Sequence, residues 1–212
     1  MRLVGIFGGT FNPIHYGHLH MAQALADALT MDEVKFIPSA NPPHKDHVTV
    51  AAEHRAAMVN LAIAKNPLFS IDELERNRAG VSYTIDTLIS LRQSLGKETA
   101  LCLMMGSDVF INLDTWHRWQ ELLDYAHIIF VQRPGKPQQA LPNQLQTLMH
   151  DHYTENRSEL SRNHAGLINM QAISALDISA TQIRAHLKHG LSVKHLLPEE
   201  VAIYIQQHHL YQ

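Results

Sequence analysis

Two histidines near the N-terminus stand in a setting that suits phosphate chemistry. They are His15 and His18 in the stretch GGTFNPIHYGH at 8–18, which directly follows the apolar run LVGIF. Side chains three residues apart at a helix start can point toward one point in space. Imidazoles can donate hydrogen bonds to phosphate oxygens and, when protonated, neutralise charge that develops in phosphoryl transfer. We therefore expect both histidines to be catalytic.

The glycines of the same stretch indicate that a ligand approaches the backbone closely. Gly8 and Gly9 end the apolar run, and Gly17 removes a side chain that would block access to the histidines. The N-terminus of a following helix would offer N–H groups and a positive dipole to an anion. Neither G-x-G-x-x-G nor the G-K-[ST] end of a P-loop occurs here. The glycines alone thus indicate an anion site without specifying its ligand.

A metal site and a purely structural role are the two alternatives to a phosphate site. A metal site of His15, His18 and His20 would lack a matching carboxylate or cysteine set nearby and the i, i+4 pairing of helical zinc motifs. Histidines that only stabilise the fold are the second alternative, because 16 histidines in 212 residues form close pairs by abundance alone. We expect no metal ion held by protein side chains.

The apolar pattern predicts the elements that position these residues. Runs of strand length occur at 2–7, 34–38, 68–72, 100–105, 127–131 and 167–173. Segments with helical spacing occur at 18–29, 54–65, 84–95, 181–190 and 198–209. This alternation predicts an α/β fold, Rossmann-like and doubly wound, with a mainly parallel sheet of five to six strands and helices on both faces. The stretch at 8–18 then lies at a strand's carboxyl end, where such sheets bind ligands.

The length and the absence of repeats favour one domain. We expect a single domain over 1–212, with a small C-terminal helical part at about 178–212. The Pro- and Gly-rich stretch at 133–144 is expected to be a surface loop.

Composition limits the partners and the compartment. The chain is 45% hydrophobic and 17% charged, so it can bury a sizeable core. Its formal net charge of −3, without a Lys/Arg run, argues against a nucleic-acid partner. The one cysteine, Cys102, lies in an apolar run, which is typical of a core residue in a reducing compartment. No stretch has the length of a membrane span or the pattern of a signal peptide, so we expect a cytoplasmic protein without a membrane partner. The sequence leaves open whether the protein forms a homo-oligomer.

Two motifs resemble those of one superfamily. The sequence HYGH at 15–18 resembles the H-x-G-H signature of the nucleotidyltransferases, and ISATQIR at 178–184 is similar to the I-S-S/A-T-x-I-R element of adenylyltransferases. The resemblance implies binding of a nucleoside triphosphate and attack on its α-phosphate. In the second motif Ser179 or Thr181 can cap a helix, and Arg184 one turn on can bind the β- and γ-phosphates.

Further stretches resemble the bacterial nicotinate mononucleotide adenylyltransferases, in order and over nearly the whole chain. They are NPPHK at 41–45, YTIDTL at 83–88, GSDVFINLDTWHRW at 106–119, RPG at 133–135 and the tail LLPEEVAIYIQQHHLY. The resemblance implies that ATP is bound by Gly8, Gly9, Thr10, Gly17, His18, Gly106, Asp108, Ser179 and Arg184. It implies that the second substrate is bound by His44, Lys45, Thr84, Trp116, His117 and Arg133.

The resemblance also implies individual roles. Trp116 would stack on the pyridine ring, and the backbone N–H groups of Thr84 and His117 would hold the nicotinate carboxylate. Thr84 is expected to cap the helix it opens, and Trp119 is expected to pack in the core.

The implied reaction transfers AMP from ATP to nicotinate mononucleotide and gives deamido-NAD and pyrophosphate for NAD biosynthesis. The attack would be direct and in line, without a covalent intermediate, and Mg²⁺ would arrive with ATP rather than occupy a protein site. Two residues depart from the commonest family pattern. Asn12 stands where many relatives carry Asp, and Ala180 where many carry a second Ser.

Other functions on the same fold are less consistent with these motifs. The NPPHK loop and the W-x-x-W segment argue against a phosphopantetheine adenylyltransferase, and ISATQIR argues against a cytidylyltransferase. A non-catalytic nucleotide sensor would not need intact His15, His18 and Arg184. A tRNA synthetase would need an anticodon-reading region and more length.

Overall fold

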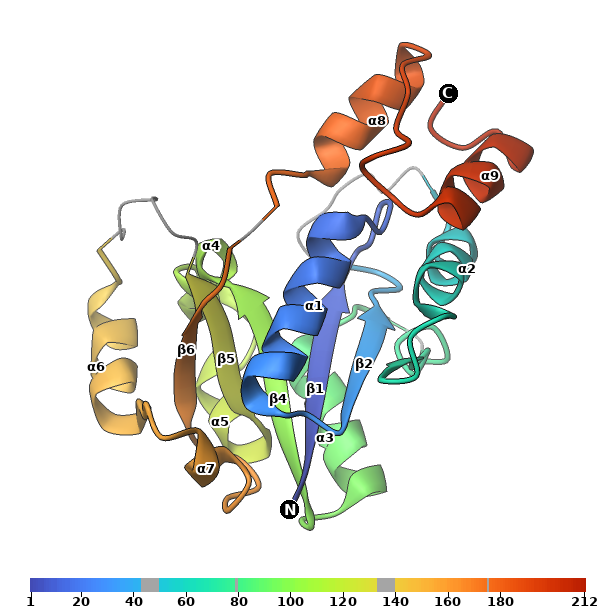
Figure 1. The fold of residues 1–212 in the computed structure, drawn as a ribbon. Helices are drawn as coiled ribbons and strands as arrows, with labels where there is room; N and C mark the ends of the chain where they lie inside the picture. Colours follow the sequence, from blue (N-terminus) through green and yellow to red (C-terminus); the bar gives the residue numbers. More distant parts are fainter. Residues whose placement is uncertain (43–49, 79, 133–139, 175) are drawn as a thin grey trace.

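A parallel sheet with helices on both faces forms the centre of the molecule (Figure 1). The computed structural model describes residues 1–42, 50–78, 80–132, 140–174 and 176–212. Within them the six strands are β1 (Arg2–Gly9), β2 (Glu33–Pro38), β3 (Phe69–Ile71), β4 (Thr99–Gly106), β5 (His127–Gln132) and β6 (Ile168–Ala172). Their order is β3-β2-β1-β4-β5-β6, and every neighbouring pair is parallel. The predicted Rossmann-like sheet is confirmed, and no predicted strand boundary is wrong by more than two residues.

The strands are buried on both faces, which explains their continuous apolar runs. In β1, Leu3 and Phe7 belong to one buried cluster, whereas Val4 and Ile6 belong to the other. The first cluster lies under α1 (Tyr16–Leu29), α2 (Ala52–Ile63) and α9 (Glu199–Gln207). The second lies under α3 (Thr84–Leu95) and α5 (Leu122–Tyr125), which are behind the sheet in Figure 1. Cys102 is fully buried in the first cluster, as predicted for a core residue.

Several short elements escaped the sequence prediction. They are α4 (Ser107–Phe110), α5, α6 (Asn143–His152), α7 (Arg157–Leu160) and the 3-10 turns η1 (Leu113–Thr115) and η2 (Trp119–Glu121). The predicted end of the loop at 133–144 is wrong, because α6 already begins at Asn143 and buries Leu145. Residues 133–139 of that stretch lie outside the described residues.

The C-terminal part brings α8 (Ala180–Lys188) and α9 to the carboxyl end of the strands (Figure 1). Among the described helices, none is both long and apolar enough to cross a bilayer.

Candidate active site

Two cavities lie side by side where the strand order reverses between β1 and β4. The larger, about 440 Å³, lies over the carboxyl ends of both strands, and the smaller, about 230 Å³, lies beside the start of α8. Both cavities are lined by His18, Met21 and Gly106, so they meet at these residues. Open parallel sheets bind ligands at this reversal. Most of the predicted site residues that the structure describes line one or both of these cavities.

His15 and His18 lie together at the start of α1, with His15 as the N-cap residue. Their rings stack with centroids 3.7 Å apart and an interplanar angle of 25°. The backbone N–H of His15 donates to Nδ1 of His18 over 3.3 Å. His18 lines both cavities, whereas His15 lines only the smaller one.

Burial changes the chemistry available to His15. The side chain is only 5% exposed, and its Nδ1 is buried without a hydrogen-bond partner. Desolvation lowers the pKa of His15 to about 4, because burial disfavours the charged imidazolium. At neutral pH His15 is therefore uncharged. It can form hydrogen bonds, but it cannot neutralise charge on a phosphate, contrary to what the sequence had led us to expect.

Gly17 and Gly106 stand at positions with little room for a side chain. A Cβ at Gly17 would lie 3.0 Å from Nδ1 of His15 and 3.3 Å from the carbonyl oxygen of Ile178. A Cβ at Gly106 would overlap the carboxylate of Asp108. Both glycines also line the smaller cavity, so a side chain at either position would disturb the site directly.

The second motif begins α8 at the rim of the smaller cavity. Ser179 is the N-cap residue, and its Oγ accepts from the N–H of Gln182 over 3.2 Å, so the predicted Ser179 cap is confirmed. Ser179 and Ala180 line the cavity. Arg184 lines neither cavity and instead donates to the carbonyl oxygen of Asn12 over 2.8 Å and to Oγ1 of Thr181 over 3.2 Å.

The larger cavity is lined by three of the residues expected to bind the second substrate, together with part of the ATP set. From the predicted sets its lining contains Gly8, Gly9, Thr10, His18, Thr84, Gly106, Asp108, Trp116 and His117. Trp116 is partly buried at the edge of the second cluster. The ring of His117 lies against Tyr83 with centroids 4.3 Å apart. Tyr83, Trp116 and His117 thus form an aromatic wall of the cavity.

The expected cap at Thr84 is wrong. The N-cap residue of α3 is Tyr83, which makes no side-chain cap hydrogen bond, and Thr84 is the first helical residue. Thr84 still lies in the first turn, where N–H groups have no partner within the helix. Trp119 packs against the second cluster as predicted, although it remains partly exposed.

Three predicted residues, His44, Lys45 and Arg133, lie outside the described residues.

Two buried charged residues of the site were missed from the sequence. Arg55 is 1% exposed and donates to the carbonyl oxygens of Thr10 (2.7 Å) and Ser39 (2.6 Å), with longer bonds to those of Ala40 and Val50. It thus ties the β1–α1 loop to the segments around β2 and α2. Nothing in the local sequence HRAAM distinguishes it from a solvated helix residue.

Glu75 is the second, with an exposure of 6% in the lining of the larger cavity. Its Oε1 accepts from Oγ1 of Thr87 over 2.7 Å, and its Oε2 has no hydrogen-bond partner. A buried carboxylate oxygen in this state can accept a hydrogen bond from a ligand.

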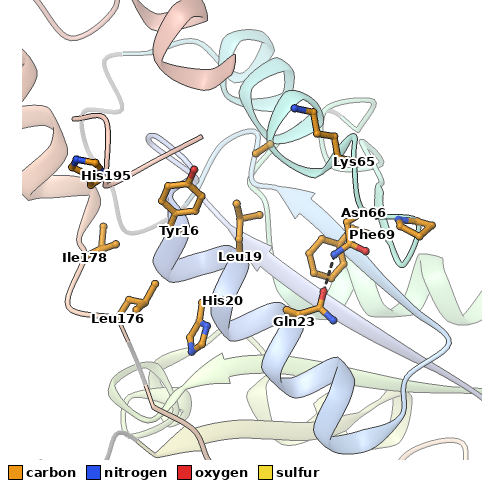
Figure 2. A pocket seen from close by; sticks show the side chains of 12 residues that line it. Tyr16, Leu19, His20, Gln23, Lys65, Asn66, Phe69, Leu176, Ile178 and His195 are labelled. Carbon is orange, nitrogen blue, oxygen red and sulfur yellow. Dashed lines mark hydrogen bonds between the residues drawn. The ribbon is translucent and has the colours of Figure 1, made fainter. Parts of the chain in front are cut away.

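A third, shallow depression of about 670 Å³ lies beside α1, between this helix and the end of α2 (Figure 2). None of the candidate residues lines it. His20 lines both this depression and the smaller cavity, and its Nε2 lies 2.7 Å from the carbonyl oxygen of Ser174. Within the described part of the chain, no group of three or more His, Cys, Asp or Glu side chains is arranged to hold a metal ion.

Comparison with known proteins places this site in a family. A family model described as "Cytidylyltransferase-like" matches residues 6–186. A curated protein of Aeromonas salmonicida (strain A449) is 46% identical over 99% of this chain and 97% of its own length. A protein of Halorhodospira halophila is 44% identical over 95% of this chain and 91% of its own length. Both are named "Probable nicotinate-nucleotide adenylyltransferase".

Solved structures agree in fold. The nicotinic acid mononucleotide adenylyltransferase of Plasmodium falciparum, complexed with NaAD, matches with a TM-score of 0.74 at 17% identity. The match covers 100% of this chain and 98% of that one. The same protein complexed with APC matches with a TM-score of 0.72. At these identities the likeness concerns the fold, and the curated relatives carry the assignment. This chain belongs to the cytidylyltransferase-like family and, within it, to the nicotinate-nucleotide adenylyltransferases.

Proposed function

We propose that the protein transfers AMP from ATP to nicotinate mononucleotide, with deamido-NAD and pyrophosphate as products. The observation that carries the proposal is the junction of two cavities at His18, beside the reversal point of the sheet. A reaction between two nucleotides needs two neighbouring sites with a shared wall. The names of the curated relatives support the identity of the substrates.

ATP would occupy the smaller cavity and extend to the β1–α1 loop. Ser179 at the start of α8 and Gly17 at the start of α1 place two helix N-termini around it, which favours a polyphosphate. Gly8, Gly9 and Thr10 would accommodate the transferring phosphate, with Gly106 and Asp108 near the nucleoside. Arg184 would bind the outer phosphates, because its two bonds use only two of the five guanidinium N–H donors.

Nicotinate mononucleotide would occupy the larger cavity. Trp116 would stack on the pyridine ring, and N–H groups at Thr84 and His117 would hold the carboxylate. His44, Lys45 and Arg133 are retained as proposed ligands of its phosphate side.

The proposed chemistry is a single in-line displacement. A 5′-phosphate oxygen of nicotinate mononucleotide forms a bond to the α-phosphorus of ATP while the bond from that phosphorus to the pyrophosphate oxygen breaks. The nucleophile is already an anion, so no general base is needed. Catalysis would come from alignment and from hydrogen bonds to the transferring phosphate. His18 would donate from the junction of the cavities, and neutral His15 would fix the orientation of the His18 ring by stacking.

We propose that Mg²⁺ enters with ATP and is held mainly by phosphate oxygens and water. Asp108 and Glu75 are the carboxylates among the described residues that line the two cavities, which is too few for a protein cage. Bound in this way, the ion would reduce the negative charge of the triphosphate.

The test is product formation by the purified protein with ATP and Mg²⁺. Nicotinate mononucleotide, nicotinamide mononucleotide and phosphopantetheine are offered in parallel, and nucleotides and pyrophosphate are quantified. Deamido-NAD and pyrophosphate formed chiefly with the first acceptor are the expected result. Turnover chiefly with another acceptor would overturn the assignment of the larger cavity. ATP binding without turnover would favour a nucleotide sensor.

A further inference from the structure

The last residues of the chain return to the loop that carries the site. The backbone turns sharply after α9, where His209 and Tyr211 both have positive φ angles, 51° and 65°. Residues other than glycine adopt this conformation rarely, and it persists only where surrounding contacts hold it. Leu210 donates its N–H to the carbonyl oxygen of Ile205 over 3.0 Å, which closes the turn. The turn directs Tyr211 back toward the β1–α1 loop.

Tyr211 makes a specific contact with that loop. Its Oη donates to Oδ1 of Asn12 over 2.7 Å. Burial raises the pKa of Tyr211, so the phenol remains protonated and able to donate at physiological pH. Asn12 follows Phe11 and Thr10, and Thr10 lines the larger cavity.

Two further contacts from the C-terminal part reach Asn12 and the start of α1. Arg184 of α8 donates to the carbonyl oxygen of Asn12, and the carbonyl oxygen of Leu196 accepts from the N–H of Tyr16 over 3.0 Å. The Asn12 residue is thus held at its main chain by Arg184 and at its side chain by Tyr211. Tyr16 is the residue between His15 and Gly17, at the start of α1.

Helix α9 contacts α2 through side chains that do not touch the β1–α1 loop. Nδ1 of His54 and Oη of Tyr204 lie 2.9 Å apart, and Lys65 pairs with Glu200 over 2.5 Å. Tyr204 therefore supplies a matched control for Tyr211. Both are C-terminal tyrosines with one hydroxyl contact, but only Tyr211 contacts the loop of the site.

We propose that Tyr211 is a positioning residue. Through its hydrogen bond to Asn12 it holds the β1–α1 loop in the conformation that binds ATP. The inference rests on the proposed function for the identity of the nucleotide. Preorganising a loop lowers the ordering cost of binding. The C-terminal part of the chain would therefore contribute to nucleotide affinity through a residue that lines neither cavity.

The test compares Tyr211→Phe with Tyr204→Phe, using the Kd of ATP by calorimetry, kcat/KM for ATP and the melting temperature. Loss of one hydrogen bond corresponds to about a 3- to 10-fold change in an equilibrium constant. We expect Tyr211→Phe to raise the Kd of ATP and lower kcat/KM for ATP by about this factor. Tyr204→Phe should lower the melting temperature without changing either ATP parameter.

A double-mutant cycle with Asn12→Ala distinguishes action through Asn12 from a general loss of stability. In the Asn12→Ala background, Tyr211→Phe should have no further effect on the Kd of ATP. Unchanged ATP binding in Tyr211→Phe, equal losses in both tyrosine variants, or additive effects in the cycle would overturn the inference. Because ATP binding is measured without an acceptor, absence of turnover with nicotinate mononucleotide would instead count against the proposed function.

Discussion

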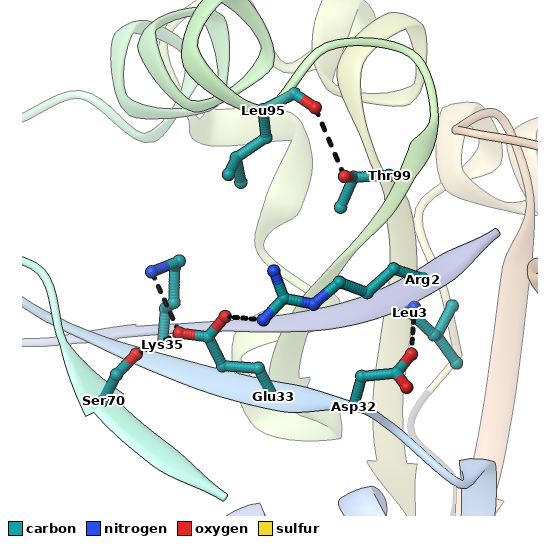
Figure 3. Close-up of polar contacts among 8 residues, drawn as sticks. All are labelled: Arg2, Leu3, Asp32, Glu33, Lys35, Ser70, Leu95 and Thr99. Atoms are coloured by element: carbon teal, nitrogen blue, oxygen red, sulfur yellow. Dashed lines mark hydrogen bonds and ion pairs between the residues drawn. The ribbon is translucent and has the colours of Figure 1, made fainter.

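The two ends of the sheet carry similar polar groups but differ in whether those groups have hydrogen-bond partners. At the amino end, Glu33 is bonded by Arg2, Lys35 and Ser70, and Asp32 accepts from the N–H of Leu3 over 2.7 Å (Figure 3). At the carboxyl end, Nδ1 of His15 and Oε2 of Glu75 are buried without partners, and near the amino end so is Nε of Arg92. Native proteins leave few such groups, and those that persist are often found where function requires them. The carboxylates at the amino end are thus bonded, whereas the carboxyl end leaves an imidazole nitrogen and a carboxylate oxygen available to a ligand.

Two arginines, each bonded to four carbonyl oxygens, make a similar contrast; Arg55 is buried and Arg92 is partly buried. Arg92, near the amino end, donates to the carbonyl oxygens of Gly96, Thr99, Tyr125 and His164. Arg55 does the same with four carbonyl oxygens at the carboxyl end. Burial lowers the pKa of both guanidinium groups. Each guanidinium group thus links several loops through carbonyl oxygens. Arg55 links loops at the candidate site, whereas Arg92 links loops at the opposite end of the sheet.

The largest expected effect follows from replacing Arg55. Arg55→Met leaves buried carbonyl oxygens without donors, and we expect the free energy of unfolding to fall by about 3–5 kcal/mol. Chemical denaturation measures this loss. Any folded fraction should also bind ATP more weakly, because the Thr10 carbonyl is released.

Arg92→Met is the matched control. It should lower the unfolding free energy as well, while the folded protein keeps its Kd for ATP. Equal loss of ATP affinity in both variants would contradict the contrast between the two ends.

The buried histidine predicts a pH-dependent stability. The pKa of His15 is about 4 in the folded protein and about 6.5 when unfolded, so the unfolded state binds this proton more readily. The contribution to stability is complete above pH 6.5 and is lost as the pH falls toward 4, by about 3 kcal/mol.

Comparing the pH dependence of unfolding in wild type and His15→Asn isolates this contribution. His127, which is also buried with a lowered pKa, remains in both proteins. Identical slopes between pH 6.5 and 4 would show that His15 is not held neutral.

The aromatic wall of the larger cavity predicts a smaller and more selective effect. Trp116→Ala should raise KM for nicotinate mononucleotide by about 10-fold, since stacking on a planar ring contributes about 1–3 kcal/mol. KM for ATP should change little. Trp119→Ala is the control, because Trp119 packs on the same cluster without lining either cavity. A similar rise in KM for both substrates in Trp116→Ala would identify Trp116 as a packing residue.

The sequence predicted the sheet because its strands depend on local patterns. Apolar runs such as ALCLMM mark strands buried on both faces, and the residues after them fall at one edge of the sheet. The four-residue helices α4, α5 and α7 are too short for a helical period to emerge.

Long-range packing could not be read in the same way. The neutrality of His15 depends on its burial in the folded chain, and the role of Arg55 depends on carbonyl oxygens at 10, 39, 40 and 50. The contact between Tyr211 and Asn12 spans 199 positions. These features belong to tertiary structure and have no local signature.

The most direct test of the contrast between the two ends is kcat for deamido-NAD formation by His18→Ala beside Glu33→Gln. His18 lies where the cavities meet, and Glu33 lies in the satisfied cluster at the opposite end. We predict that His18→Ala folds normally and loses about 100-fold or more in kcat, as expected for removal of a donor to the transferring phosphate. Glu33→Gln should retain the wild-type kcat. A folded His18→Ala protein with near-normal turnover would contradict the role of the carboxyl end as the catalytic one.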